Sequence, residues 1–358
     1  MNFNYKWNLK DLPKPTNGKV FSCFASGGGS SMGYKLAGFD VIGINEIDKK
    51  LVADYLKNFN PKYVYNEDIR DFKLRDDLPE ELYNLDILDS SPPCTSFSMA
   101  GVRDRDWGKK RKFKEGGTEQ TLDDLFFEYI EVLDKLKPKI AIAENVKGIV
   151  MGKAKKYVIN IMKALDSIGY YANFYVLDSS LMGVPQKRQR FFIIAVRKDL
   201  APKIDPKLET DKMIDYSIFD HIEIEDNRKI DLNKLPRYLP ELDFNLQENV
   251  IPLKEAFEGK LPKTDRQNYR ENRFGDVMVK MEKPLPTIVT VHRYWTDTEN
   301  LLNMETMKNC GSWPHDYKWE LKETPTRVLY SLGMSVPPVM MANVAKAVKE
   351  QYLDKINK

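Results

Sequence analysis

Cysteine is scarce in this 358-residue chain, which contains only Cys23, Cys94 and Cys310. So few cysteines, with no Cys/His cluster at zinc-ligand spacing, argue against a disulfide framework and against a structural metal site. No apolar run is long enough to span a bilayer, and Met1 to Leu12 lacks the apolar stretch of a signal peptide. We therefore expect a cytoplasmic protein that binds neither membrane nor metal and has one cysteine free for chemistry.

Net charge is also low, at +3, so the overall charge indicates no class of partner. The charge is unevenly distributed, however, because Arg103 to Lys114 contains seven basic residues and only two acidic ones. A second basic cluster lies between Lys187 and Lys198. Such clusters suit contacts with phosphate groups, although a solvated surface explains a charge run about as well.

The first half of the chain alternates short apolar strands with amphipathic helices. Strands are predicted at 20–24, 41–44, 85–88, 140–143, 171–177 and 191–196. Helices, with apolar side chains at helical spacing, are predicted at 29–37, 51–56, 121–136 and 157–168. Repeated strand–helix units of this kind predict an α/β fold, in which helices cover both faces of an open, mostly parallel sheet.

The strand–helix pattern ends at about Asp199, and residues 199–283 are rich in Asp, Lys, Pro and Asn. We interpret this stretch as a second, smaller and irregular domain. Pro337-Pro338 then opens an amphipathic helix that runs through Leu353. Since that helix has no sheet of its own, we expect it to pack against the first domain. The predicted division is a first domain at 1–198, a second at 199–283 and a returning segment at 284–358.

A glycine-rich turn, Ser26-Gly27-Gly28-Gly29, follows the first predicted strand. Glycines at the start of a helix let backbone amides approach a ligand closely. Glu46 ends the second strand, about where an acidic residue meets ribose hydroxyls in nucleotide-binding folds. Asp68 follows the end of a possible third strand. Its side chain could contact an adenine amino group or could cap a loop. The turn is not the dinucleotide-binding pattern G-x-G-x-x-G, and a tight structural turn explains it nearly as well.

A cysteine follows two prolines in Ser91-Pro92-Pro93-Cys94, where the strand at 85–88 leaves the sheet. Open α/β sheets place their sites at the carboxyl ends of the strands, so this thiol would be presented rather than buried. Most isolated cysteines, by contrast, are buried packing residues. The position of Cys94 therefore indicates a reactive thiol without excluding a structural one.

Charged side chains occur at the same predicted edge of the sheet. Glu144 directly follows the strand at 140–143, and a partly desolvated carboxyl group there can hold a proton near neutral pH. Alternation sends Arg188 and Arg190, just before the strand at 191–196, to one face, which suits a phosphate or a carboxylate. The alternatives are a helix-capping acid at Glu144 and a structural salt bridge for the arginines.

These features occur in a specific order: the glycine-rich turn, Glu46, Asp68-Ile69, Pro93-Cys94, Glu144-Asn145-Val146 and Gln186-x-Arg188-x-Arg190. That order resembles the cytosine-C5 DNA methyltransferase family. Similar segments continue at 283–288, 302–319 and 332–338, so the resemblance covers 19–198 and 283–350. The chain departs from the family pattern at four positions. Ser22 stands where the family usually has Asp, and Ser26 stands where it often has Gly. Met304 stands where the family usually has Arg, and Met334 stands where it usually has Asn.

The resemblance implies a Rossmann-like methyltransferase fold, a mostly parallel doubly wound sheet, with a smaller irregular target-recognition domain. It also implies transfer of a methyl group from S-adenosylmethionine to carbon 5 of a cytosine that is flipped out of duplex DNA. Cys94 would add to carbon 6, because carbon 5 is a poor nucleophile until a thiolate has added. Glu144 would bind the base's N3 and amino edge, while Arg188 and Arg190 would orient the base and the nucleophile.

Two further sets of residues follow from the resemblance. The residues expected to bind the cofactor's ribose, adenine and amino-acid end are Phe24, Ala25, Ser26, Gly27, Gly28, Gly29, Glu46, Ile47, Asp68, Ile69, Pro92, Leu125, Met334 and Val336. The residues expected to contact DNA, in the basic run after Cys94 and in the target-recognition domain, are Ser98, Arg103, Arg105, Lys109, Lys110, Arg111, Arg266, Gln267, Asn268, Arg270 and Arg273.

The favoured interpretation is a monomeric DNA methyltransferase that acts on double-stranded DNA at the bacterial nucleoid. It would be the functional partner of a restriction endonuclease, or a solitary bacterial or phage enzyme. The same chemistry on tRNA is one alternative, but the tRNA-directed branch typically follows Pro-Cys with Phe-Thr, whereas this chain has Phe97-Ser98. A non-catalytic DNA-binding protein that kept the fold is another, and retention of the full set Cys94, Glu144, Arg188 and Arg190 argues against it. The spacing of the glycine-rich turn argues against a nicotinamide dehydrogenase.

Overall fold

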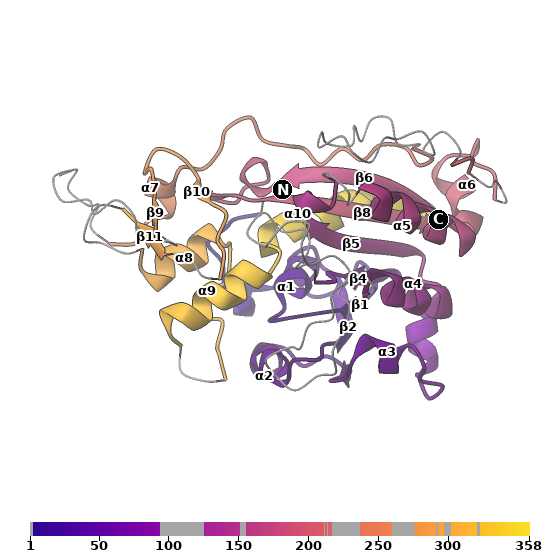
Figure 1. The fold of residues 1–358 in the computed structure, drawn as a ribbon, viewed down its shortest axis with the longest axis horizontal. Helices are drawn as coiled ribbons and strands as arrows, with labels where there is room; N and C mark the ends of the chain where they lie inside the picture. The colour runs from indigo at the N-terminus through magenta and orange to yellow at the C-terminus, as the bar shows by residue number, and fades with distance from the viewer. Residues whose placement is uncertain are drawn as a thin grey trace.

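The computed structural model describes residues 3–93, 125–150, 155–210, 212, 214–216, 237–259, 276–290, 293–296, 302–320 and 323–358. A large sheet with helices on both faces forms the main body of the molecule (Figure 1). A smaller group of helices and short strands extends from one end of that body (Figure 1).

The large sheet has seven strands in the order β3-β2-β1-β4-β5-β8-β6. In chain order, their bounds are β1 Lys19–Cys23, β2 Asp40–Asn45, β3 Tyr63–Tyr65, β4 Ile87–Ser90, β5 Ile140–Val146, β6 Tyr170–Asp178 and β8 Gln189–Arg197. Strand β8 runs antiparallel to both of its neighbours, and the other paired strands of this sheet are parallel. The predicted open, mostly parallel α/β sheet is therefore confirmed.

The reversal at β8 follows from the short connection between β6 and β8. A parallel neighbour needs a crossover of a dozen or more residues, whereas a shorter connection leaves the strands antiparallel. Here the connection holds only the 3-10 turn Ser179–Leu181 and the two-residue strand β7, Gln186–Lys187. Both strands were predicted from their apolar runs, but an apolar run carries no information about strand direction.

One face of the sheet is covered by three helices, α3 Ile69–Phe72, α4 Leu125–Leu136 and α5 Lys155–Ser167. Phe21, Leu88 and Ile193, from three different strands, share one apolar core with these helices. The apolar positions of α4 are buried, which confirms the helix predicted there. Its predicted start at Thr121 lies outside the described residues.

The opposite face is covered by the helices α1 Gly29–Leu36, α10 Pro338–Val348 and α11 Asp354–Ile356, with a π-helical turn at Lys349–Leu353. Ile140 and Ile194 of the sheet share a second core with Val344 of α10. The prediction that the C-terminal helix packs back against the sheet is therefore confirmed. Helix α1 approaches α10 so closely that a Cβ at Gly33 would lie 2.4 Å from Met341 Cβ.

The C-terminal helices also correct one expectation. The stretch Pro325–Ile356 is long and apolar enough to cross a membrane, although no such run was expected from the sequence. However, 72% of the most apolar 18-residue segment of this stretch is buried inside the protein. Packing against the sheet therefore accounts for its composition.

A third core joins the sheet to the smaller group of elements (Figure 1). That smaller group consists of α7 Leu253–Ala256, α8 Met304–Cys310, α9 Pro325–Met334 and the parallel pair β9 Asp276–Met278 and β11 Arg293–Trp295. Helix α2 Lys49–Asn58, beside the sheet, contributes Tyr55 to the same core. Trp313 and Trp319 stack at its centre with ring centroids 6.0 Å apart, and Tyr317 packs edge-on against both. Ala25 of the glycine-rich turn belongs to the same core.

The described parts of 199–283 contain only short regular elements, of which α6 Ala201–Ile204 is the first. Residues 237–247 lie against the main sheet. Asn173 Nδ2 of β6 donates to Leu239 O at 2.9 Å, and the Tyr175 and Phe244 rings pack edge to face. This part of the region is therefore held to the main body by direct contacts.

Candidate active site

The carboxyl edge of the sheet carries an ion pair between Glu144 and Arg190. Arg190 Nε lies 2.8 Å from Glu144 Oε1, and each side chain is only 12% exposed. Glu144 lies within β5, opposite Phe192 of β8, whereas its apolar neighbours predicted a position just after the strand. Pairing with β8 carries β5 on to Val146, beyond its apolar run. The structure thus joins two residues to which the resemblance assigns catalytic roles, through an ion pair of the kind considered for the arginines.

Burial and charge act in opposite directions on Glu144. Burial raises the pKa of its carboxyl group, while Arg190 and Arg188 lower it, and the net shift of the pKa is upward. A carboxyl group in this balance holds a proton closer to neutral pH than a solvent-exposed glutamate does.

Arg188 has a different environment from Arg190, although alternation predicts one shared face. Its guanidinium is buried, and Nη1 donates to Ile288 O at 2.9 Å while Nη2 donates to Gly333 O at 2.8 Å. Nε is also buried and has no hydrogen-bond partner within the described residues. Arg188 therefore clamps two segments from the C-terminal part of the chain and keeps one donor unused.

Gln186 fixes the chain just ahead of the arginines. Its Nε2 donates to Cys310 O at 3.1 Å, and its Oε1 accepts from Ile288 N at 3.1 Å. Strand β7, which contains Gln186, also pairs with β10, Leu285–Pro286. The backbone around Ile288 is thereby held in place to receive Arg188. The sequence pattern includes Gln186 only as the first residue of Gln-x-Arg-x-Arg, and it indicates no separate role for this side chain.

The second basic cluster, at 187–198, is mostly engaged within the protein. Arg197 Nε lies 2.7 Å from Asp199 Oδ1, and Lys198 Nζ lies 2.6 Å from Asp166 Oδ1. The two arginines at the start of the cluster are buried or ion-paired as described above. Lys187 is exposed. Most members of this cluster therefore have partners within the protein, and Arg190 has the carboxylate partner that was one of the two expected for it.

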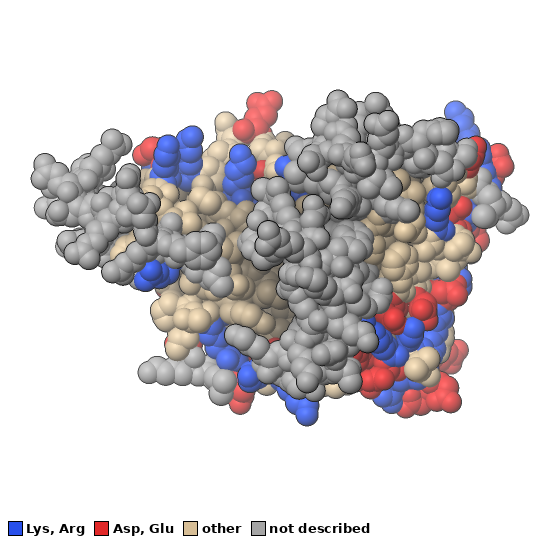
Figure 2. All heavy atoms as spheres, viewed as in Figure 1, with Lys and Arg blue, Asp and Glu red and all other residues tan. Residues whose placement is uncertain are grey.

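Basic and acidic side chains are also interspersed over the region of α3 and α4, as Figure 2 shows. Lys73 Nζ there lies 2.6 Å from Glu128 Oε2 and 2.8 Å from Glu131 Oε2. Paired charges of this kind largely cancel, so this surface does not present a continuous basic patch.

The backbone is left-handed at Ser26 (φ 49°) and Gly28 (φ 91°) within the glycine-rich turn, and at Phe24 (φ 54°) just before it. Ser26 N donates to Glu46 Oε2 at 2.8 Å, and Asp48 N donates to Glu46 Oε1 at 2.9 Å. Glu46 therefore holds the turn against the end of β2. Burial raises the pKa of the Glu46 carboxyl group.

Packing accounts for part of the glycine pattern. A Cβ at Gly29 would lie 2.6 Å from Ser335 Cβ and 2.7 Å from Val336 O. A Cβ at Gly28 would lie 3.1 Å from the Tyr55 ring. These glycines therefore let α1 meet the C-terminal segment and α2, whether or not a ligand also approaches the turn.

The other residues expected to bind the cofactor differ in exposure. Ile47 and Met334 are 47% and 49% exposed, whereas Ile69, Pro92, Leu125 and Val336 are buried. Asp68 caps α3, because its side chain accepts from Arg70 N at 2.9 Å. That contact is the capping role considered for Asp68, and its carboxylate also pairs with Arg70 Nη1 at 3.4 Å.

Pro92 and Asn145 join the segment before Cys94 to the strand that carries Glu144. Asn145 Nδ2 donates to Pro92 O at 3.4 Å. Cys94 itself lies outside the described residues. So do the residues expected to contact DNA, which are Ser98, Arg103, Arg105, Lys109, Lys110, Arg111, Arg266, Gln267, Asn268, Arg270 and Arg273.

Buried hydroxyl groups without partners lie beside the glycine-rich turn. Ser26 Oγ and Ser335 Oγ make no hydrogen bond within the described structure. Ser335 lies directly against Gly29. Since buried polar groups are almost always hydrogen-bonded, this set fits a ligand with several polar groups. S-adenosylmethionine, with ribose hydroxyls and an amino-acid end, is such a ligand.

A buried carboxyl group that the sequence patterns did not indicate also lies at this edge. Asp89 Oδ2 accepts from Ser22 Oγ at 2.6 Å, and Oδ1 accepts from Tyr34 Oη at 3.1 Å. Ser22 and Asp89 are register partners in β1 and β4. Burial raises the pKa of Asp89 to about 7. The sequence signal for this site is Asp89 itself, an acidic residue directly after the predicted strand at 85–88. If the strand continues past Leu88, Asp89 lies inside it and is buried.

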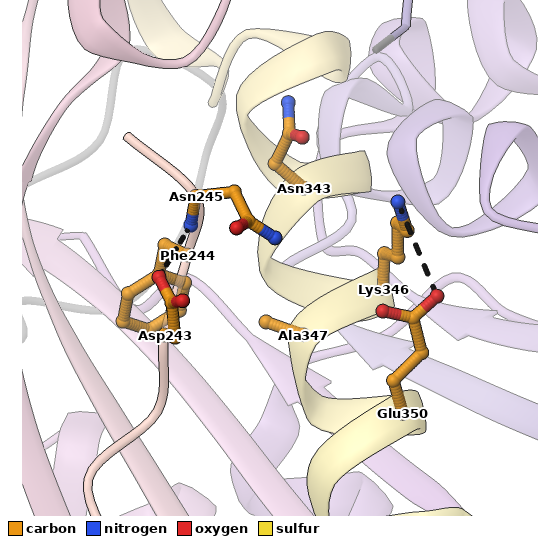
Figure 3. A pocket seen from close by; sticks show the side chains of 7 residues that line it. All are labelled: Asp243, Phe244, Asn245, Asn343, Lys346, Ala347 and Glu350. Atoms are coloured by element: carbon orange, nitrogen blue, oxygen red, sulfur yellow. Dashed lines mark hydrogen bonds and ion pairs between the residues drawn. The ribbon is translucent and has the colours of Figure 1, made fainter. Parts of the chain in front are cut away.

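A pocket of about 240 Å³ lies elsewhere, between α10 and residues 243–245 (Figure 3). Asn343, Lys346 and Glu350 line its helical side (Figure 3). None of the residues expected to act in catalysis lines this pocket. It is therefore separate from the Glu144–Arg190 pair.

Together, the fold and the site define an α/β protein with a glycine-rich turn after its first strand and a largely buried acid–arginine pair at the carboxyl edge of its sheet. Comparison with known families gives this class a name. The chain belongs to the C-5 cytosine-specific DNA methylase family, whose model matches residues 18–350.

Curated relatives are similar over part of their length. Type II methyltransferase M.NgoPII of Neisseria gonorrhoeae is 32% identical over 235 residues, which are 65% of this chain and 58% of that protein. Type II methyltransferase M.FnuDI of Fusobacterium nucleatum is 35% identical over 182 residues, which are 51% of this chain and 48% of that protein. The chain thus spans about half the length of the curated relatives that it matches.

Solved structures support the fold. A candidate DNA modification methyltransferase from an E. coli prophage superposes with a TM-score of 0.60 at 21% identity, covering 94% of this chain and 99% of that one. Spodoptera frugiperda DNMT2 superposes with a TM-score of 0.58 at 16% identity, covering 95% and 99%. The predicted Rossmann-like methyltransferase fold is therefore confirmed.

Proposed function

We propose that this protein is a DNA (cytosine-5)-methyltransferase. It transfers a methyl group from S-adenosylmethionine to carbon 5 of a flipped-out cytosine in a specific sequence of duplex DNA. The observation that carries the proposal is the largely buried Glu144–Arg190 ion pair, 2.8 Å long, at the carboxyl edge of the sheet. It supports the proposal because it occurs in a chain whose family match spans residues 18–350.

Glu144 holds the cytosine by its N3 and amino edge. Because burial raises the pKa of Glu144 against the opposing effect of Arg190, the carboxyl group can share a proton with N3 as the base becomes activated. Arg190 orients that carboxyl group. Arg188 positions the strand through its carbonyl contacts, and its unused Nε is a donor for the base or for the segment that carries the nucleophile.

Cys94 supplies the nucleophile. Its thiolate forms a sulfur–carbon bond at carbon 6, and the electron pair of the 5,6 double bond becomes available at carbon 5. S-adenosylmethionine provides the electrophilic methyl group that carbon 5 takes up. Loss of the carbon 5 proton to a base then restores the double bond and expels the Cys94 thiolate.

The glycine-rich turn, from Phe24 to Gly29, holds the cofactor. Glu46 contacts the ribose hydroxyls, Asp68 contacts the adenine amino group, and Ile47 flanks the adenine ring. The remaining lining residues are Ile69, Pro92, Leu125, Met334 and Val336. The hydroxyls of Ser26 and Ser335 support this location, since they lie at the turn, are buried and have no hydrogen-bond partner among the described residues.

Duplex DNA is the proposed partner. The basic run Arg103 to Lys114 would contact phosphates, which positions the duplex, and residues 199–283 would form the target-recognition domain that reads base edges. In this division, 1–198 and 284–358 together form the catalytic domain. We propose that the protein acts as a monomer in the cytoplasm. It is the partner of a restriction endonuclease, like relatives named type II methyltransferases, or solitary, like the orphan methyltransferase M.SPRI of Bacillus phage SPR.

Transfer of a labelled methyl group from S-adenosylmethionine to plasmid DNA tests the proposal. The wild-type protein should label the plasmid, and Cys94→Ala should not. Cys310→Ala is the matched control, because the Cys310 thiol is buried in the third core and should not affect the chemistry. Labelling that survives in Cys94→Ala contradicts the proposal, and labelling of tRNA in place of the plasmid indicates the RNA-directed alternative.

A covalent trap tests the role of Cys94 separately. In DNA that contains 5-fluorocytosine, carbon 5 has no proton to lose, so the adduct at carbon 6 should persist as a denaturation-resistant complex. Cys94→Ala should form none. Specific DNA binding with neither turnover nor trapping would identify a non-catalytic binding protein.

A further inference from the structure

Asp89 is a carboxyl group buried without a cation. Its side chain is 2% exposed, and its two oxygens accept from the neutral hydroxyls of Ser22 and Tyr34 at 2.6 and 3.1 Å. No Lys or Arg of the described residues forms an ion pair with it. A buried carboxylate that lacks a compensating charge is costly, and such groups concentrate at functional sites.

The two hydrogen-bond donors come from the two elements that flank the glycine-rich turn. Ser22 lies on β1, just before Phe24, and Tyr34 lies on α1, which begins at Gly29. Asp89 is therefore tied to the chain on both sides of the turn. Within the described residues, the buried hydroxyl of Ser90 on β4 has no hydrogen-bond partner. The carboxyl group thus lies in the structure that carries the proposed cofactor site.

We propose that Asp89 supplies a negative charge that favours the cationic sulfonium cofactor over its neutral-sulfur product. This inference rests on the proposed function. S-adenosylmethionine has a positively charged sulfur, whereas S-adenosylhomocysteine has the same adenosine and amino-acid end but a neutral sulfur. Transfer of the methyl group removes the positive charge, so the attraction to Asp89 ends and the product dissociates more readily.

The charge of Asp89 depends on groups from every element packed around it. Those groups are Cys23 on β1, Tyr34 on α1, Tyr55 on α2, Tyr129 on α4 and Glu144 on β5. Burial raises the pKa of the thiol and of the three phenols, so these stay neutral near pH 7. Among these five, only Glu144 can add negative charge, and Arg190 pairs with it.

Ionisation of Asp89 should therefore depend on pH in the physiological range. Burial raises its pKa to about 7, so the carboxyl group is partly protonated at neutral pH. A bound cation favours the carboxylate. The affinity for S-adenosylmethionine, relative to that for S-adenosylhomocysteine, should therefore increase as the pH rises through about 7.

Equilibrium binding of both compounds to the full chain, between about pH 5.5 and about pH 8.5, tests the inference. The ratio of the two dissociation constants is the readout, because titration of the shared amino-acid end cancels in it. In the wild type the ratio should move towards S-adenosylmethionine by about tenfold, the size expected for two unit charges on the order of 10 Å apart inside a protein. In Asp89→Asn it should stay at the wild-type low-pH value.

Ser22→Ala is the matched control. It removes a hydrogen bond to the carboxylate but not the charge, so the pH dependence should persist with a higher midpoint. Tyr34→Phe should act in the same way, and these two variants still test the inference if Asp89→Asn fails to fold. A ratio independent of pH in the wild type, or an unchanged dependence in Asp89→Asn, overturns the inference. Failure of the wild type to bind either compound contradicts the proposed function itself.

Discussion

Arg190 Nε lies 2.8 Å from Glu144 Oε1, so one ion pair bridges the antiparallel strands β5 and β8 at the edge of the sheet where the candidate site lies. Both side chains are largely buried. The charge of each therefore depends on the other, because removing one partner leaves an uncompensated charge in a poorly solvated position. The pair links the chemistry of the site to the stability of the sheet.

Glu144→Gln separates these two contributions. The amide keeps the size of the side chain and an acceptor for Arg190, but it carries no charge and holds no proton. We expect methyl transfer in a single turnover to fall by at least about 100-fold, the lower range for loss of a general acid or base. Glu131→Gln, an exposed change on α4, is the control and should transfer at the wild-type rate. A Glu144→Gln rate within a few-fold of wild type would remove Glu144 from the mechanism.

Arg188 should matter first for stability. Arg188→Ala leaves the buried carbonyl of Ile288 and the partly buried carbonyl of Gly333 without their donors, which should lower the free energy of unfolding by roughly 2–4 kcal/mol. Arg188→Lys retains a cation and should lose less. Urea denaturation measures both, with the exposed neighbour change Lys187→Ala as control. If Arg188→Ala is as stable as Lys187→Ala, the clamp described here does not hold the two segments.

Ser26→Gly should raise stability and weaken cofactor binding. Ser26 has a φ of 49°, which glycine adopts with less strain, so the free energy of unfolding should rise by about 0.5–1 kcal/mol. The change also removes a buried hydroxyl that the cofactor is proposed to engage. Thermal unfolding and binding of S-adenosylmethionine measure the two effects. Ser30→Gly, inside α1, should lower stability; a loss of stability in Ser26→Gly too would contradict the argument from backbone strain.

Asp89 should make stability depend on pH. Its pKa in the folded protein is about 7, above the value of about 3.9 for an unfolded aspartate. The folded state therefore binds the proton more tightly, and the resulting stability is fully present below about pH 4 and lost as the pH rises through about 7. Between pH 5 and pH 8, the wild type should lose roughly 2–3 kcal/mol of unfolding free energy that Asp89→Asn does not lose. Chemical denaturation of both proteins at the two pH values provides the measurement, and equal losses would show that Asp89 does not titrate in this range.

Strand positions were predictable because strands buried on both faces are continuous apolar runs. The run 20–24, for example, corresponds to β1 at Lys19–Cys23. Where a strand ends was less predictable, because hydrogen bonding to a neighbour can continue past the apolar residues. Pairing with β8 carries β5 through Glu144 to Val146, and pairing with β1 carries β4 through Asp89 to Ser90.

The members of the candidate site were predictable from their order along the chain, but their contacts were not. Nothing local distinguishes Arg188 from Arg190, since their different partners are set by tertiary structure. Arg188 reaches carbonyls that lie 100 and 145 residues further along the chain. The Ser22–Asp89 hydrogen bond joins residues that are 67 positions apart in the sequence. The periodicity of the sequence does not indicate that Ser22 and Tyr34 donate to Asp89.

The long reach of Arg188 has a consequence for how the protein is made. A ribosome releases β5 and β8 well before it reaches Ile288 and Gly333, and α10, which fills one face of the sheet, emerges later still. The growing polypeptide therefore holds its acid and its arginines without the backbone that fixes them. Until the last helix has been translated and docked, the nascent chain lacks both the carbonyls that hold Arg188 and the helix that covers one face of the sheet.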